Sequence, residues 1–135
     1  MNAFSILFRT SRFNLSKVGE NFINPCCFGE DVATWLRTKL IDGRIEVRQP
    51  YQEDWGWELP AKDGSDSYYL CVSGNSDESS ANRDMGEWRI IVEKRRSLSQ
   101  RLSGQGKISV NDKMARAIEA ILSREPTIGD VHRER

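Results

Sequence analysis

Residues 54–73 read DWGWELPAKDGSDSYYLCVS, two alternating runs joined through an Asp-Gly pair at 63–64. In the first run Trp55, Trp57 and Leu59 fall on one side, which is the pattern of a strand with one buried face. Asp-Gly is a preferred hairpin turn because glycine adopts positive φ at no steric cost. The stretch therefore predicts a β-hairpin whose tryptophans belong to the core.

Further strands are predicted on both sides of this hairpin. Residues 3–8, 44–48 and 85–93 alternate between apolar and polar side chains, and Trp88 and Val92 share one face of the last run. Strands that follow one another through short turns favour antiparallel pairing. We therefore expect an antiparallel meander.

Two amphipathic helices are predicted to flank these strands. The first is expected to begin at Asn24-Pro25, because Asn caps helices and Pro suits the first helical position, and to end at Gly43. The second is expected between Ser109, as its N-cap, and Pro126. Their apolar residues recur at helical spacing: Val32, Trp35, Leu36 and Leu40 in the first, and Met114, Ala117, Ile118, Ile121 and Leu122 in the second.

The predicted fold class is α+β, with an antiparallel sheet of four or five strands in the order β-α-β-β-β-β-α. Two main helices would pack on one face of the sheet and leave the other face to solvent or to a partner. The chain length of 135 residues suits one domain. Within it, residues 1–24 form an N-terminal strand and loop, residues 25–125 the core, and residues 126–135 a flexible tail.

The charge balance argues against a general nucleic-acid-binding protein. Lys and Arg together number 20, as do Asp and Glu, so the formal net charge is zero, whereas phosphate neutralisation usually needs a basic excess. The apolar run near the N-terminus is too short for a signal peptide, and no stretch is long enough to span a bilayer. We expect a cytoplasmic protein without a membrane partner.

The three cysteines are predicted to be reduced, buried and structural. Cys26 and Cys27 are adjacent and are not expected to bridge, and Cys71 has no obvious partner. A cysteine nucleophile would need a general base, but the sole histidine, His132, lies in the expected tail. Neither a metal site nor a cofactor is expected.

Carboxylates cluster in the first run of the hairpin. Glu53, Asp54 and Glu58 flank the tryptophans, and three interpretations stay open. They form the solvated face of a strand, they bind Arg or Lys of a partner, or they divide acid and base roles in a small hydrolase or ligand-binding domain. No complete catalytic constellation accompanies them, so a non-enzymatic role is expected.

Two further groups of charged residues are candidates for binding. Glu87 and Arg89 alternate along the strand at 85–93, where they would form cross-strand ion pairs or, for Arg89, clamp an anion. Residues 94–107 contain Arg95, Arg96 and three more basic residues but no acidic one, with a short helical turn expected to end near residue 104. This segment is a solvated connector or contacts phosphate or an acidic protein surface.

The segments 28–36, 53–57 and 86–89 resemble a small bacterial single-domain family of uncharacterised proteins. In size and style the chain, over roughly residues 22–122, also resembles immunity proteins of polymorphic toxin systems. No catalytic residue is carried over by this resemblance. It implies a cytosolic protein that blocks another protein by surface complementarity.

The predicted function is therefore a protein-protein interaction module, of the immunity or inhibitor type, that neutralises a cognate bacterial toxin. The alternatives are a small hydrolase or ligand-binding domain and a nucleic-acid-associated protein using residues 94–107. A homodimer also stays open. The expected partner-binding residues are Glu53, Asp54, Glu58, Glu87, Arg89, Arg95 and Arg96.

Overall fold

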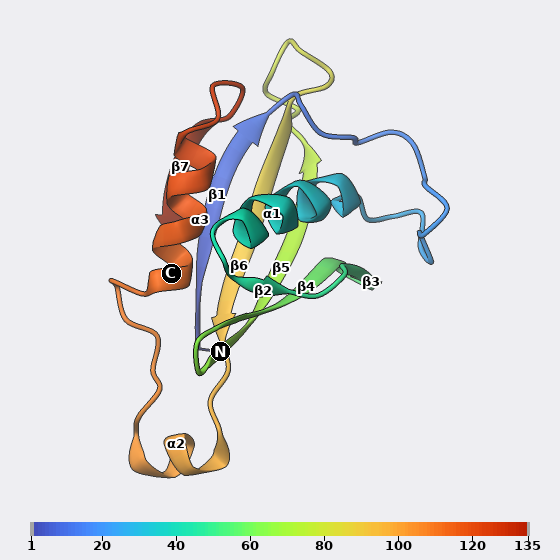
Figure 1. Ribbon diagram of the computed structural model, residues 1–135. Helices are drawn as coiled ribbons and strands as arrows, with labels where there is room; N and C mark the ends of the chain where they lie inside the picture. Colours follow the sequence, from blue (N-terminus) through green and yellow to red (C-terminus); the bar gives the residue numbers. More distant parts are fainter. Residues whose placement is uncertain (1, 135) are drawn as a thin grey trace.

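The computed structural model describes residues 2–134 and arranges them as one antiparallel sheet with helices on one of its faces (Figure 1). The strands are β1 (Ala3–Thr10), β2 (Glu46–Val47), β3 (Tyr51–Glu53), β4 (Gly56–Asp63), β5 (Asp66–Ser76), β6 (Gly86–Lys94) and β7 (Gly129–Glu134). The helices are α1 (Glu30–Asp42), α2 (Leu98–Ser103) and α3 (Lys113–Ser123). The predicted α+β class and antiparallel sheet are confirmed.

The sheet has more strands than the four or five that were predicted. Its order is β2-β4-β5-β6-β1-β7, and β3 pairs with β4 beside β2. Residues 129–134 form β7 where the sequence predicted a flexible tail, because the chain reverses after α3 and pairs with β1, with Leu7 opposite His132. Ile128, 8% exposed, packs into the core just before this strand and fixes the reversal.

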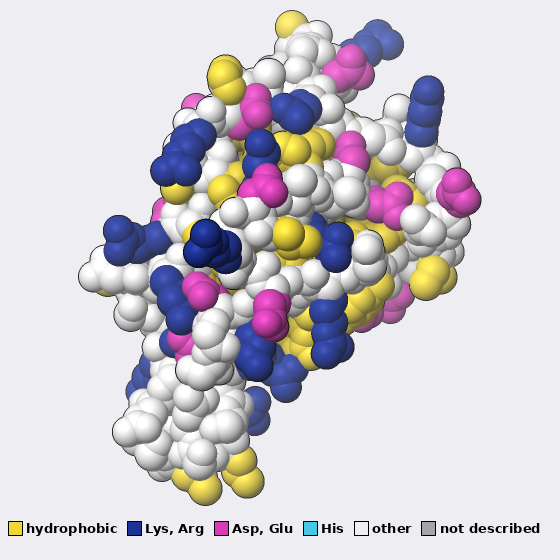
Figure 2. Space-filling view, in the orientation of Figure 1, with side chains coloured by type: hydrophobic (Ala, Val, Ile, Leu, Met, Phe, Trp, Pro, Cys, Tyr) yellow, Lys and Arg dark blue, Asp and Glu magenta, His cyan; other side chains and the backbone are white. Residues whose placement is uncertain are grey.

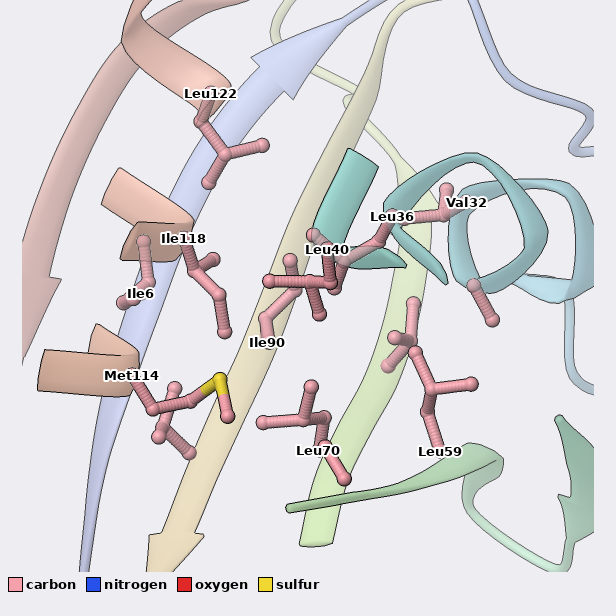
Figure 3. Close-up of a cluster of buried hydrophobic side chains, with 14 of the residues drawn as sticks. Ile6, Val32, Leu36, Leu40, Leu59, Leu70, Ile90, Met114, Ile118 and Leu122 are labelled. Carbon is pink, nitrogen blue, oxygen red and sulfur yellow. The ribbon is translucent and has the colours of Figure 1, made fainter. Parts of the chain in front are cut away.

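The core lies between the sheet and the two main helices, as the apolar spacing predicted. Figure 3 shows Leu36 and Leu40 of α1 and Ile118 of α3 pointing toward strand residues that include Ile90. Alternate residues of β1 and β6 are buried, so one face of each strand faces the helices. Each large apolar side chain buried in this way contributes about 2 kcal/mol of transfer free energy.

Both main helices begin later than predicted. The N-cap of α1 is Gly29, where an added Cβ would lie 3.2 Å from the Val72 side chain and 3.3 Å from Trp57, and residues 24–28 are not helical. The N-cap of α3 is Asp112 and not Ser109, because the Asp112 carboxylate accepts hydrogen bonds from the first free N–H groups of the helix. The first residue of each helix therefore depends on contacts that the capping preferences of the sequence did not predict.

The tryptophans divide between core and surface. Trp57 and Trp88 are 1% exposed, as predicted, but Trp55 is 46% exposed, so its assignment to the core was wrong. β4 begins only at Gly56, which has φ +156 and packs against the Val72 carbonyl. Trp55 therefore belongs to the turn before the strand and lies outside the alternation.

Residues 95–110 form an arm that extends from one end of the sheet and carries α2 (Figure 1). The predicted short turn is present: Ser97 caps α2, and Gly104 ends it in the left-handed conformation. None of the residues of α2 is buried, and Leu98 and Leu102 are 73% and 81% exposed. None of the helices within residues 2–134 is long and apolar enough to cross a membrane.

Candidate functional site

The face of the sheet that carries no helix presents three of the predicted binding residues. Glu58 lies opposite Cys71, and Arg89 lies opposite Leu7 and Ser73 in the ladder. Glu87, two residues before Arg89 on β6, points to the same side. The alternation of the strands therefore places these charges correctly, away from α1 and α3.

The strongest candidate site is an acidic aromatic patch on β3, β4 and the turn between them, formed by Tyr51, Glu53, Asp54, Trp55 and Glu58. Tyr51 and Trp55 are 41% and 46% exposed. The Tyr51 hydroxyl donates a hydrogen bond to the Glu58 carboxylate, and this bond raises the pKa of Tyr51. The patch thus combines two exposed aromatic rings with three carboxylates on one short hairpin.

A buried glutamine holds the patch against the N-terminal loop. Gln52 is 7% exposed, and its Oε1 accepts hydrogen bonds from the backbone N–H groups of Ile23 and Asn24. Its Nε2 donates to the carbonyls of Asn24 and Cys27, at 2.7 and 3.1 Å. The side-chain amide of Gln52 is fully satisfied by these four bonds. β3 is therefore fixed in place, and so are the exposed side chains on its other face.

Cys26 and Cys27 are joined by a disulfide, and Cys26 is exposed, contrary to the prediction of reduced, buried thiols. Their sulfurs lie 3.8 and 3.2 Å from the Asp54 carbonyl oxygen, so the loop held by Gln52 turns both side chains to the same side. Cys71 is free and buried, as predicted. The disulfide lies beside the patch at the backbone of Asp54.

Cys71 is expected to react about a thousandfold more slowly than an ordinary thiol at pH 8. Burial, reinforced by Glu58, Glu93 and Glu53, raises the pKa of Cys71 from 9.0 to about 12 and depletes the thiolate. The measurement is the rate of labelling by a disulfide reagent in the folded chain against the unfolded chain.

The same shift makes stability dependent on pH. Because the folded pKa of Cys71 is raised, its stabilising contribution is complete below pH 9 and is lost as the pH rises toward 12. Cys71→Ala should remove this part of the alkaline loss. Rapid labelling of the folded protein, or an unchanged alkaline profile in the variant, would contradict the assignment.

The structure does not bring Glu87 and Arg89 to the acidic aromatic patch. Spacing along and across the strands places their Cα atoms about 16 and about 12 Å from that of Glu58. The Arg89 guanidinium lies 3.6 Å from Glu134 and 3.4 Å from the Ser5 hydroxyl. Arg89 is therefore separated from the carboxylates of the acidic aromatic patch and lies beside Glu134 instead.

Arg95 and Arg96 line a second feature, a basic groove of about 730 Å³ between the arm and the β2–β4 edge. Arg48 and Lys62 complete its cationic lining, and neither was predicted from the sequence as a binding residue. Lys62 lies on β4, and Arg48 follows β2, with its N–H bonded to the Pro60 carbonyl. The sequence indicated a strand at 44–48 and a basic segment at 94–107. It did not indicate that these two segments lie close together in the fold.

Within the part of the chain that the structure describes, no three His, Cys, Asp or Glu side chains are grouped to hold a metal ion. Comparison of the chain with protein-family models, with curated proteins and with solved structures found no match.

Proposed function

We propose that this chain is a non-enzymatic interaction protein that binds a basic protein partner through the acidic aromatic patch. The observation that carries the proposal is the exposure of Trp55 among Glu53, Asp54 and Glu58. Tryptophan is the residue type most enriched at energetically dominant positions of protein interfaces, and surrounding charges select the partner.

The rigidity of the patch supports the proposal. The four hydrogen bonds of Gln52 and the bond from Trp57 Nε1 to the Cys27 carbonyl, at 3.0 Å, fix the backbone on the buried side. A surface held in place before binding loses little conformational entropy when a partner docks. An immunity or inhibitor role fits such a surface, since inhibition by complementarity needs shape and charge and no catalytic group.

The test reverses the charge of the patch. Glu53→Lys combined with Asp54→Lys is expected to abolish recovery of the partner, because like charges would face its basic surface. Both residues lie at the surface, so the free energy of unfolding should change by less than about 1 kcal/mol. The measurement is affinity purification from the native host with quantitative mass spectrometry, together with a denaturant melt.

A charge-matched control is available on the loop between β5 and β6. Glu78→Lys combined with Asp84→Lys changes two exposed carboxylates away from β3 and should leave recovery unchanged. A recovered protein that arrests growth when expressed alone, and not when this chain is co-expressed, would support the immunity role. Equal recovery by the patch variant and the native sequence would refute the proposed surface.

A further inference from the structure

We infer that the basic groove is a binding site for a phosphorylated ligand of small-molecule size. Four cationic side chains line it, and they come from two separate parts of the fold: Arg48 and Lys62 from the β2–β4 edge, and Arg95 and Arg96 from the arm. Its volume of about 730 Å³ lies in the range of small-molecule pockets. This site shares no lining residue with the acidic aromatic patch and does not depend on its function.

Positive charge is concentrated in the groove. The lining contains four cations and one carboxylate, Glu46, on a chain whose formal net charge is zero. Within residues 2–134, none of the four cations forms an ion pair with a carboxylate. Like charges held close together destabilise the folded chain, and an anion bound between them would relieve this repulsion.

The walls of the groove are preformed. At the base of the arm, the Asn2 side chain donates to the carbonyls of Lys94 and Gly106, at 3.1 Å each, and accepts from the Ile108 N–H at 2.8 Å. The Arg95 N–H donates to the Ser67 carbonyl at 2.8 Å. The arm and the sheet edge are thereby held at a fixed separation.

Two of the arginines are also oriented. The Arg96 guanidinium donates to the carbonyls of Gln100 and Gln105, at 3.0 and 2.9 Å. The Arg95 guanidinium lies 4.7 Å from the centre of the Tyr69 ring. A stacked guanidinium keeps its N–H edge free for an anion, so the groove presents donors without having to order them on binding.

The side chains that line the groove are suited to binding a phosphate group. Guanidinium groups match the oxygens of a phosphate in pairs, and ammonium and serine hydroxyl groups add single donors. Pro60 and Tyr69 supply an apolar wall for the organic part of the ligand.

The test uses the full chain with inorganic pyrophosphate and with ATP, in isothermal titration and in amide chemical-shift mapping. We expect saturable binding to one site, with shifts at Ser67 and Arg95 and an affinity that falls as salt is added. Arg48→Gln combined with Lys62→Gln should raise the Kd for pyrophosphate at least about tenfold. Both side chains are exposed, so an unchanged thermal melt is expected to show that the variant is folded.

Arg83→Gln is the matched control, because Arg83 is exposed on the loop at the opposite end of the sheet from the arm (Figure 1). It should leave the Kd unchanged. The inference is overturned if neither probe saturates at millimolar concentration, or if Arg83→Gln weakens binding as much as the groove variant. Shifts confined to other parts of the chain, or tighter binding of single-stranded DNA that the groove variant does not reduce, would also overturn it.

The phosphate could belong to a soluble molecule or to a lipid headgroup, and the arm separates these sources. The exposed Leu98 and Leu102 lie at i and i+4 on α2, and Figure 2 shows hydrophobic side chains at the end of the arm. The lipid probe is vesicles of phosphatidylcholine with and without phosphatidic acid. Loss of vesicle binding in Leu98→Ser combined with Leu102→Ser, with the pyrophosphate Kd retained, would assign a lipid headgroup.

Pyrophosphate binding without vesicle binding would assign a soluble ligand. Vesicle binding that persists when Arg48 and Lys62 are replaced by Gln would count against the groove in either case.

Discussion

Gly56→Ala is expected to lower the free energy of unfolding by about 3 kcal/mol or more and to disturb the acidic aromatic patch at the same time. A Cβ at residue 56 would lie 2.2 Å from the Val72 carbonyl oxygen and 3.2 Å from the Ser73 Cβ. The carbonyl belongs to the backbone of the neighbouring strand β5 and cannot rotate away. The clash and the positive φ together account for the magnitude.

The measurement is chemical denaturation followed by tryptophan fluorescence. Because Gly56 separates buried Trp57 from exposed Trp55, relief of the clash must move one of the two rings, and the emission of the folded state should change. Gly129→Ala is the control, since a Cβ there has nothing within 4 Å, and it should cost less than about 1 kcal/mol. A stable Gly56→Ala protein with native emission would contradict the close approach of residue 56 to the Val72 carbonyl.

Asp112→Ala is expected to cost about 3 kcal/mol. The carboxylate is 5% exposed and accepts hydrogen bonds from the N–H groups of Met114 and Ala115 at 3.0 Å each. It also accepts one from the Tyr68 hydroxyl at 2.8 Å. The substitution removes the N-cap of α3, which lowers the free energy of unfolding by about 1 kcal/mol. It also leaves buried hydrogen-bond donors without partners, which lowers it further, by about 1–3 kcal/mol.

Tyr68→Phe provides the comparison. It removes only the hydroxyl and leaves the cap of α3 intact, so its cost should be about 1 kcal/mol. A double-mutant cycle by denaturant unfolding should give a favourable coupling energy between Asp112 and Tyr68, because their side chains are in contact. Independent effects of the two substitutions would mean that the cap and the tyrosine bond do not act together.

Gly56→Ala and Asp112→Ala destabilise the fold. The paired substitutions Glu53→Lys with Asp54→Lys, and Arg48→Gln with Lys62→Gln, change only surface side chains. The distinction matters for any binding experiment on this protein. Loss of binding together with loss of stability reports on the fold, and loss of binding at unchanged stability reports on the surface.

Periodicity along the chain was sufficient to predict the fold class. In β6 the alternation of apolar residues marks the face that buries Trp88, Ile90 and Val92. In α3 the helical spacing from Met114 to Leu122 marks the buried face in the same way. The exposed charges of Glu58, Glu87 and Arg89 followed from the same alternation. An antiparallel sheet with two helices on one face, and charged residues on the other, needs no information beyond these patterns.

Other features depended on contacts between residues far apart in the sequence. Trp55 is exposed because Gly56 meets Val72, and residues 23–27 are held away from helix by Gln52, 28 residues beyond Asn24. β7 is ordered by its pairing with β1, from the opposite end of the chain.

The basic groove exists because the arm brings Arg95 beside Arg48 and Lys62. Periodicity reports which side of an element is buried. It does not report which residues far away in the sequence an element contacts. Such long-range contacts determine the positions of both the acidic aromatic patch and the basic groove.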